Sequence, residues 1–307
     1  MKVLIFGANG LVGSSTVNIL SKKTEYTSVI GSTRKDTNLF SYQETFNKID
    51  EIKPNIVINA AAKVGGILAN NTMRTEFILE NLKINLNILE SLKSFPEIKL
   101  INLGSSCIYP LGAKNPIKEE YIMTGSLEPT NSPYAMAKLT AIEIGDALNR
   151  QYGNKIVNLM PTNLYGPNDN FSENESHVIP GLISRMHKAK LEGVDRFDIW
   201  GTGKPLREFL YSEDLAEAIH FVIRNEINEK LLNVGSGEEI SIEKLSELVK
   251  KIVSFEGSLN FDNTKPDGNP RKLLDSSRIF NLGWKPTTSL QNGISRTYKW
   301  YLDSIGL

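Results

Sequence analysis

The chain has 307 residues, in which 35 lysines and arginines balance 35 aspartates and glutamates. This balance excludes a global field that would attract nucleic acid or an anionic membrane, so any basic site must be local. The single cysteine cannot form an intramolecular disulfide, and the apolar run at the N-terminus is too short for a signal peptide. No stretch approaches the roughly 20 apolar residues of a membrane span, and we expect a cytoplasmic protein.

The first 160 residues alternate short apolar runs with longer amphipathic segments. Each run is almost continuously hydrophobic, which is typical of parallel strands that are covered on both faces. The runs lie at 2–6, 27–31, 55–60, 98–104 and 155–160. Helical patterns between them complete a βαβ rhythm. The sequence therefore predicts an α/β protein with a Rossmann-type, doubly wound parallel sheet.

Beyond about residue 165, loops rich in glycine, proline and asparagine separate shorter elements. Helices are expected at 178–191, 213–225, 241–253 and 289–303. We expect Ser212 to cap the second of these helices and Asp214 to add charge to its first turn. No low-complexity linker divides the chain. We therefore expect an N-terminal domain at 1–165 and a smaller α/β lobe at 166–307 that packs on it, with some crossing of the chain between the two.

Three glycines, Gly7, Gly10 and Gly13, follow the first strand and open the first helix. Glycine allows a tight turn and lets backbone N–H groups approach a pyrophosphate at the positive end of the helix. Such turns also close ordinary strand–helix corners, but the strand–loop–helix context favours a dinucleotide site. The cofactor contacts expected from this loop are Gly7, Asn9, Gly10, Leu11, Val12 and Gly13.

The end of the second strand indicates which dinucleotide is bound. NAD-binding proteins usually place a carboxylate there for the ribose diol, whereas this chain has "STRK" at 32–35. A guanidinium can pair bidentately with a 2′-phosphate, which a carboxylate would repel. Arg34 and Lys35 could instead be solvated loop charges, and Asp36 lies close by. We expect NADP(H), with Arg34 as the residue that binds its 2′-phosphate.

Tyr134 and Lys138 stand four residues apart at the start of a helical pattern that Pro133 introduces. This spacing places both side chains on one face of the helix. An ammonium group beside a phenol favours the phenolate and so lowers the pKa of the tyrosine. Such a pair can move a proton at neutral pH while a hydride moves to or from carbon. Ser105, after the fourth strand, completes the pattern.

The glycine loop, Ser105, Tyr134 and Lys138 together resemble the extended short-chain dehydrogenase/reductase superfamily. Longer strings narrow the resemblance, among them "GSSCIYP" (104–110), "SHVIPGLISRMH" (176–187) and "WGTGKPLREFL" (200–210). Across nearly the whole chain these strings resemble the GDP-L-fucose synthases, NADPH-dependent 3,5-epimerase/4-reductases of GDP-4-keto-6-deoxy-D-mannose. Some relatives carry a basic residue where this chain has Asn9, which leaves more of the 2′-phosphate recognition to Arg34.

The resemblance implies that Cys107 and His177 are the acid/base pair for epimerisation. A thiol and an imidazole both titrate near enough to neutrality to exchange protons with carbon atoms next to a ketone. Taken singly, a cysteine after a strand is most often packing, and a histidine at a helix start is often part of a cap. The resemblance further implies that Ser105 hydrogen-bonds the C4 oxygen, that Tyr134 protonates it, and that Lys138 supports Tyr134 and the nicotinamide ribose.

The remaining expected site residues also follow from the resemblance, and no metal is expected. Further cofactor contacts are Ala60, Ala61, Ala62, Lys138, Pro161, Asn163, Leu164 and His177. The expected GDP-sugar contacts are Asn163, Val178, Leu182, Arg185, Trp200, Arg207 and Lys272. Arginine suits a pyrophosphate because its planar fork matches phosphate oxygens. For Trp200, packing between the lobes is the competing interpretation.

The resemblance implies a homodimer in which helices 72–94 and 134–152 pair into a four-helix bundle. Two other functions stay open. One is an epimerase/reductase for a different GDP-4-keto sugar, of the deoxyheptose or colitose type. The other is a non-catalytic protein that senses a dinucleotide. Such a sensor has no reason to retain Ser105, Cys107, Tyr134, Lys138 and His177 together.

Overall fold

A computed structural model describes residues 1–173, 175–265 and 267–307. Its largest sheet has six parallel strands in the order β2-β1-β3-β4-β5-β9. These strands are β1 (Lys2–Phe6), β2 (Ser28–Ser32), β3 (Ile56–Asn59), β4 (Lys99–Leu103), β5 (Lys155–Pro161) and β9 (Leu231–Val234). The strand order reverses between β1 and β3, as in Rossmann-type sheets, so the predicted fold class is confirmed.

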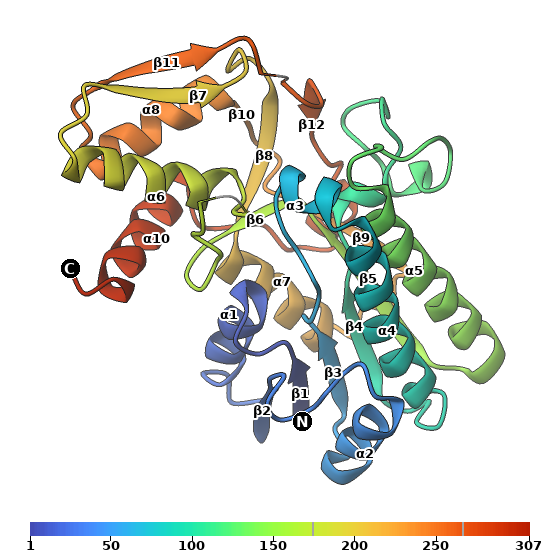
Figure 1. Cartoon of the computed structure of the whole chain (residues 1–307). Coiled ribbons are helices and arrows are strands. Elements are labelled where there is room, and N and C mark those ends of the chain that lie inside the picture. Colours follow the sequence, from blue (N-terminus) through green and yellow to red (C-terminus); the bar gives the residue numbers. More distant parts are fainter. Residues whose placement is uncertain (174, 266) are drawn as a thin grey trace.

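Helices cover both faces of this sheet (Figure 1). Since alternate residues of a strand point to opposite faces, each strand contributes side chains to two apolar cores. Val3 and Ile5 pack toward α1 and α7, whereas Leu4 and Phe6 pack toward α2, α4 and α5. Both faces are buried, which explains why the strands read as continuous apolar runs. The bounds of these helices are α1 Leu11–Leu20, α2 Tyr42–Ile52, α4 Arg74–Leu92, α5 Ser132–Tyr152 and α7 Ser212–Arg224.

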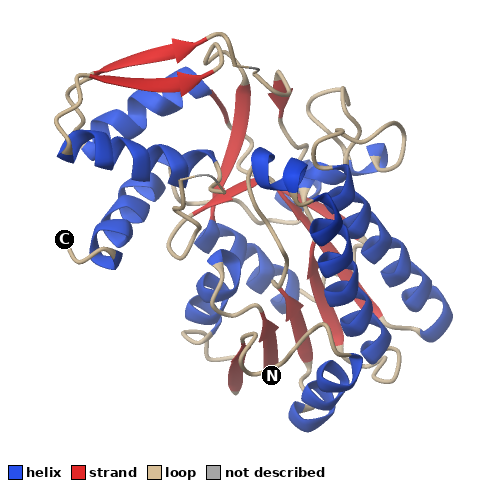
Figure 2. Cartoon of the chain, in the orientation of Figure 1, coloured by secondary structure: helices blue, strands red, loops and turns tan. Residues whose placement is uncertain are grey.

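The smaller lobe is built on short strands (Figure 2). Its main sheet has the order β10-β8-β12, and β6 also pairs with β8; β11 and β7 form a separate pair. Helices α6, α8 and α10 enclose a second core. The strands are β6 (Asn163–Tyr165), β7 (Arg196–Trp200), β8 (Leu206–Tyr211), β10 (Glu239–Ser241), β11 (Ser258–Asp262) and β12 (Arg271–Lys272). The helices of the lobe are α6 (Val178–Leu191), α8 (Ile242–Val253) and α10 (Leu290–Ser304), whereas α9 (Ser277–Asn281) packs against β9, with Ile279 in the core of the large sheet.

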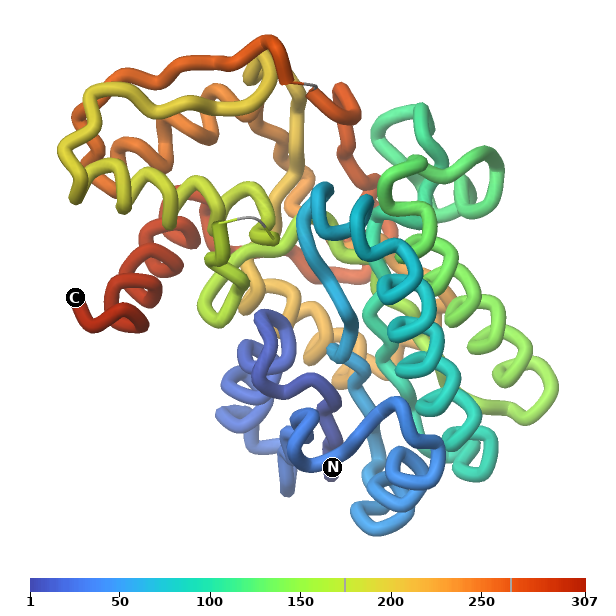
Figure 3. Tube along the Cα trace, viewed as in Figure 1, coloured from blue at the N-terminus to red at the C-terminus, as the bar shows by residue number. Residues whose placement is uncertain are grey.

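The chain returns twice from the smaller lobe to the large sheet, first after β8 and again at α9, which packs against β9. After β8 it returns to the large sheet, where α7 packs against α1 and β9 adds the last strand beside β5. Figure 3 shows this yellow-to-orange segment next to the blue N-terminal helix. The domain boundary at residue 165 stays a prediction, and the sheet itself extends beyond that residue. Three short elements complete the chain: α3 (Ile67–Thr72), η1 (Ser106–Ile108) and η2 (Glu119–Tyr121).

The expected helix cap at Ser212 is wrong. Helix α7 begins at Ser212 itself, and its N-cap residue is Tyr211, whose side chain makes no capping hydrogen bond. The Ser212 hydroxyl instead accepts a hydrogen bond of 2.8 Å from Ser15 of α1. Asp214 does lie in the first turn, but its carboxylate also accepts hydrogen bonds from the backbone N–H groups of Thr287 and Thr288. Both side chains therefore serve long-range contacts.

Candidate active site

The glycine loop connects β1 to α1 in a shape that requires glycine at two positions. Gly7 has a φ of 78°, and a Cβ there would lie 2.7 Å from the backbone nitrogen of Ala61. At Gly13 a Cβ would lie 2.0 Å from the carbonyl oxygen of Gly7. Gly10, the N-cap residue of α1, has room for a Cβ, since the nearest atom would be 3.5 Å from it. This arrangement fits a bound dinucleotide, because it presents the helix N-terminus at an unobstructed edge of the sheet.

The side chains that would distinguish NADP from NAD follow β2. Arg34 is exposed there and, among the described residues, forms no salt bridge. Oδ2 of Asp36 accepts hydrogen bonds from the backbone and hydroxyl of Thr33, at 2.8 and 2.7 Å. These two bonds lower the pKa of Asp36. The nearby acid is thus engaged in its own turn, and the guanidinium of Arg34 is free to bind an anion.

Tyr134 and Lys138 lie on α5 beside the end of β4, as the sequence spacing predicts. The Nζ of Lys138 is buried, donates a 2.7 Å hydrogen bond to the carbonyl of Leu103, and lies 5.8 Å from the centre of the Tyr134 ring. Burial lowers the pKa of Lys138 to about 8. Burial also raises the pKa of Tyr134, with nearby Cys107 adding to the rise and a hydrogen bond with Ser105 opposing it. The expected lowering of the tyrosine pKa by Lys138 is therefore wrong in this structure, because desolvation outweighs the distant ammonium group.

Cys107 lies in η1, directly after β4, and its side chain is half-buried. Its Sγ is 3.5 Å from Nδ2 of Asn131 and 3.7 Å from Nζ of Lys272. The backbone N–H of Cys107 donates to Oγ of Ser105 at 3.2 Å. The thiol thus faces polar donors beside Ser105 and Tyr134 and is not part of the apolar clusters under the sheet. Its catalytic role stays a prediction.

His177 is the N-cap residue of α6, and 43% of its side chain is exposed. Its Nδ1 lies 3.9 Å from Oδ1 of Asp169, a carboxylate that is only 6% exposed. The segment before His177 crosses the N-terminal part of the chain, where the backbone N–H of Gly66 donates to the carbonyl of Glu175. A Cβ at Gly66 would lie 2.8 Å from the carbonyl oxygen of Ser176. The close crossing brings the start of α6 to the N-terminal unit.

The basic residues expected at the substrate lie on neighbouring strands. Arg207 of β8 and Lys272 of β12 pair in register, and burial lowers the pKa of Arg207. Asn163 of β6 donates to the backbone carbonyl of Glu208 at 2.8 Å. Arg185 of α6 is largely buried against the ring of Phe197, which lies 5.5 Å away, and its pKa is lowered by that burial. Arg207, Lys272 and Asn163 thus lie on one sheet of the lobe, whereas Arg185 lies on α6.

The apolar substrate contacts differ in exposure. Trp200 is 65% exposed, with the ammonium of Lys265 at 5.7 Å from its ring, so packing between the lobes does not explain it. Val178 is 42% exposed. Leu182, in contrast, is buried in the core of the smaller lobe, because the inner face of α6 packs there. A substrate contact by Leu182 stays a prediction that this burial does not favour.

The other expected cofactor contacts lie around the glycine loop or at the next strand ends. Ala60 and Ala61 follow β3 and lie against Gly7. Pro161 ends β5, and Leu164 lies in β6, packed on the core of the large sheet. Ala62 directly follows Ala61 in the chain. Within the described residues, no group of histidine, cysteine, aspartate and glutamate is arranged to hold a metal ion, and no described helix has the length and apolar character to cross a membrane.

The sequence pattern of the NAD dependent epimerase/dehydratase family matches residues 3–235. The chain belongs to this family. The matched range includes β9, the strand that completes the large sheet, so the family pattern and the observed sheet end at nearly the same residue.

Several relatives within this family resemble the chain over its full length. GDP-L-fucose synthase 1 of Arabidopsis thaliana is 47% identical, with 99% of this chain and 94% of the relative covered. GDP-L-fucose synthase of Escherichia coli is 42% identical, with coverage of 99% and 97%. GDP-L-colitose synthase of Yersinia pseudotuberculosis is 37% identical, with coverage of 99% and 98%.

Solved structures agree with the fold. A GDP-L-fucose synthetase from Naegleria fowleri bound to NADP has a TM-score of 0.88 at 29% identity, covering 99% of this chain and 94% of that one. A GDP-D-glycero-L-gluco-heptose synthase from Campylobacter jejuni in the presence of NADPH has a TM-score of 0.89 at 32% identity, covering 98% of each chain.

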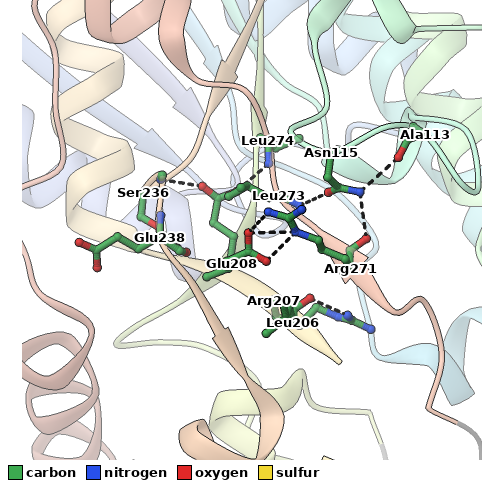
Figure 4. A network of polar contacts seen from close by, with 12 residues as sticks. Ala113, Asn115, Leu206, Arg207, Glu208, Ser236, Glu238, Arg271, Leu273 and Leu274 are labelled. Carbon is green, nitrogen blue, oxygen red and sulfur yellow. Dashed lines mark hydrogen bonds and ion pairs between the residues drawn. The ribbon is translucent and has the colours of Figure 1, made fainter. Parts of the chain in front are cut away.

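Sequence reasoning missed polar residues that surround the expected site. Asn131 reaches the thiol of Cys107, Asp169 lies beside His177, and Glu208 and Asn115 hold the strand that carries Lys272 (Figure 4). Glu208 stands inside one of the strings that carried the resemblance (200–210), but nothing in its spacing indicates its partners. Only the folded chain brings these residues to the site.

Proposed function

We propose that the protein is a GDP-L-fucose synthase, which inverts GDP-4-keto-6-deoxy-D-mannose at C3 and C5 and reduces the C4 ketone with NADPH. The observation that carries this proposal is the grouping of Cys107 with Ser105 and Tyr134 at the end of β4 and the start of α5. The identity of 42–47% to GDP-L-fucose synthases over nearly the whole chain supports it.

Inversion needs an acid and a base on opposite faces of the sugar ring. The C4 ketone acidifies the hydrogens on C3 and C5, so a modest base can remove one of them and leave an enolate. Cys107 and His177 are the assigned pair: one accepts the proton and the other returns a proton to the opposite face. The thiol is half-buried and the imidazole is 43% exposed, so neither side chain is enclosed in an apolar core.

Reduction needs a proton donor at the C4 oxygen. Tyr134 is the assigned donor, since a phenol carries a proton at neutral pH and this one hydrogen-bonds Ser105, although burial raises its pKa and so makes it a weaker acid in the absence of ligands. Ser105 hydrogen-bonds the same oxygen. Lys138, whose ammonium group donates to the Leu103 carbonyl, would hold the nicotinamide ribose. NADPH supplies the hydride when it is bound; the glycine loop would hold its pyrophosphate and Arg34 its 2′-phosphate.

A different GDP-4-keto sugar is the second candidate substrate. The relatives include a GDP-L-colitose synthase at 37% identity and a heptose synthase of closely similar fold. The same acid, base and proton donor would serve such a sugar, and only the shape of the pocket would differ. Parallel turnover measurements with the deoxymannose, deoxyheptose and colitose precursors separate these possibilities.

A homodimer through α4 and α5 is part of the proposal. These two helices pack on each other at the edge of the molecule and expose Leu79, Leu86 and Met136, each between 46 and 49% exposed. Two such pairs would bury these side chains in a four-helix bundle. Light scattering of the wild type and of Leu86→Lys tests this: the wild type should have twice the chain mass, and the variant should be monomeric. We also propose a reducing compartment such as the cytoplasm, since the one cysteine is free.

The direct test incubates the purified protein with NADPH and GDP-4-keto-6-deoxy-D-mannose. We expect the absorbance of the reduced nicotinamide to fall and a product identical to GDP-L-fucose to form. A product reduced at C4 but unchanged at C3 and C5 would contradict the epimerase half of the proposal. No consumption of NADPH would contradict the reductase half, and the recovery of a sugar unchanged at C3, C4 and C5 would contradict both halves.

A further inference from the structure

The contact between Lys272 and Cys107 joins the two parts of the molecule. Nζ of Lys272 lies 3.7 Å from Sγ of Cys107, although the residues are 165 positions apart in the chain. Lys272 belongs to β12, a strand of two residues that pairs with β8 only through Arg271–Leu206 and Lys272–Arg207. So short a ladder does not fix a flexible lysine by itself. Other contacts must hold the strand in place.

Glu208 supplies the first of these contacts. Its side chain is fully buried on β8, with Oε2 accepting the backbone N–H of Leu274 at 3.1 Å and Oε1 accepting that of Gly237 at 2.8 Å (Figure 4). Burial raises the pKa of Glu208, and these backbone N–H groups oppose that rise. A buried acid is costly unless such partners are present, so this residue is specialised for holding two backbone segments together. One of them is the segment directly after β12.

Asn115 supplies the second contact, from the loop that follows Cys107. Its Oδ1 accepts the backbone N–H of Leu273 at 2.7 Å, and its Nδ2 donates to the carbonyls of Ala113 and Arg271 at 3.2 and 3.5 Å. Asn115 therefore contacts the residues on both sides of Lys272. It ties them to the same stretch of chain that carries the thiol.

We propose that Glu208 and Asn115 are positioning residues that hold β12 so that the ammonium group of Lys272 stays beside the thiol of Cys107. An ammonium group at this distance stabilises negative charge on the sulfur, which is the form that attacks electrophiles and abstracts protons. The relevance to epimerisation rests on the proposed function. The contact itself does not, and it can be tested without substrate.

Cys107 is the only cysteine of the chain, so alkylation by iodoacetamide reports on this thiol alone. We expect Lys272→Met to slow alkylation at neutral pH about tenfold, because the sulfur loses its cationic neighbour. Glu208→Gln keeps the size of the side chain but leaves one backbone N–H facing an amide NH₂, and Asn115→Ala removes the bond to Leu273. Each should slow alkylation at least about threefold, roughly the result of losing one hydrogen bond.

Glu239→Gln is the matched control. It removes a carboxylate that contacts the exposed side chain of Arg271 on the same strand, and alkylation should stay at the wild-type rate. In the background of Lys272→Met, the Glu208 and Asn115 changes should have no further effect, since they act through Lys272. Should Glu208→Gln not fold, Asn115→Ala carries the test.

Several results would overturn the proposal. Unchanged alkylation in Lys272→Met would show that the contact does not matter to the thiol. Faster alkylation in Glu208→Gln and Asn115→Ala would show that these residues only limit access to Cys107. Deuterium uptake from D₂O into the keto sugar, without NADPH, should fall in parallel with alkylation. If the wild type takes up no deuterium, the proposed function fails while the alkylation series still decides the positioning role.

Discussion

The two parts of the molecule contribute differently to the proposed reaction. The glycine loop, Ser105, Tyr134 and Lys138 all belong to the large parallel sheet and its helices, so the residues assigned to reduction come from one unit. The residues assigned to inversion come from both units, since Cys107 follows β4 whereas His177 precedes α6 and Lys272 lies on β12. Under this assignment, reduction should depend on the geometry of the large sheet and its helices, and inversion should depend on how the lobe meets that sheet.

The largest effect on a reaction rate is expected for Tyr134→Phe. This change removes the proposed proton donor of the large sheet and its helices, called the sheet unit below. Reduction should slow about 10³-fold, within the range of general acid catalysis, while deuterium uptake at C3 and C5 persists. Stopped-flow absorbance of NADPH and mass spectrometry of the sugar measure the two steps. Equal loss of both would mean that the division between the units does not exist.

Cys107→Ser tests the residues assigned to inversion. Deuterium uptake should fall about 10²-fold, because a serine hydroxyl is a far weaker base than a thiolate. Oxidation of GDP-L-fucose by NADP, which begins with hydride transfer and needs no inversion, should keep a rate near that of the wild type. A loss of this reverse reaction as large as the loss of deuterium uptake would remove Cys107 from the inversion step.

Gly13→Ala tests how tightly the sheet unit is built. A Cβ would lie 2.0 Å from the carbonyl oxygen of Gly7, so the loop must shift and the free energy of unfolding should fall by about 2.5 kcal/mol. Gly10→Ala is the control, with a loss of at most about 1 kcal/mol, because its Cβ meets no close atom. Urea unfolding measures both. The control should still weaken NADP binding, since the methyl group lies where the pyrophosphate approaches.

Lys138 makes the stability of the same unit depend on pH. Its pKa is lowered by burial from 10.5 to about 8, so between these values the unfolded chain binds more protons than the folded one. Stability contributed by this site therefore rises as the pH increases through 8. The difference in unfolding free energy between the wild type and Lys138→Met should grow by about 2 kcal/mol from about pH 7 to about pH 9.5. A difference that stays constant would mean that Lys138 is solvated in the folded protein.

The sheet unit was also the easier part to predict from sequence. Its first five strands lie within about two residues of the apolar runs, because strands buried on both faces show continuous hydrophobicity. β9 was missed, since its four residues show no pattern of their own and join the sheet only after α7 has packed on α1. The glycine positions were readable because a backbone that excludes a Cβ admits one residue type.

The lobe and the electrostatics of the site were harder to predict. β12 has two residues, and its place depends on Glu208 and Asn115, whose partners are 66 and 158 positions away. Sequence spacing showed that Lys138 and Tyr134 share a helix face. It did not show how deeply the phenol is buried, which reverses the expected direction of its pKa shift.

The double crossing of the chain limits how specificity can be exchanged among relatives. A chimera made by a single cut after β6 would take α7 and β9 from the donor and thus replace the helix against α1 and the edge strand beside β5. A transplant confined to the smaller lobe needs five junctions, after β5, β8, β9, β12 and α9, because β6 pairs with β8 whereas α9 packs on β9. Recombination at one site should therefore yield poorly folded hybrids, whereas the five-junction graft should retain the recipient's cofactor binding and acquire the donor's sugar preference.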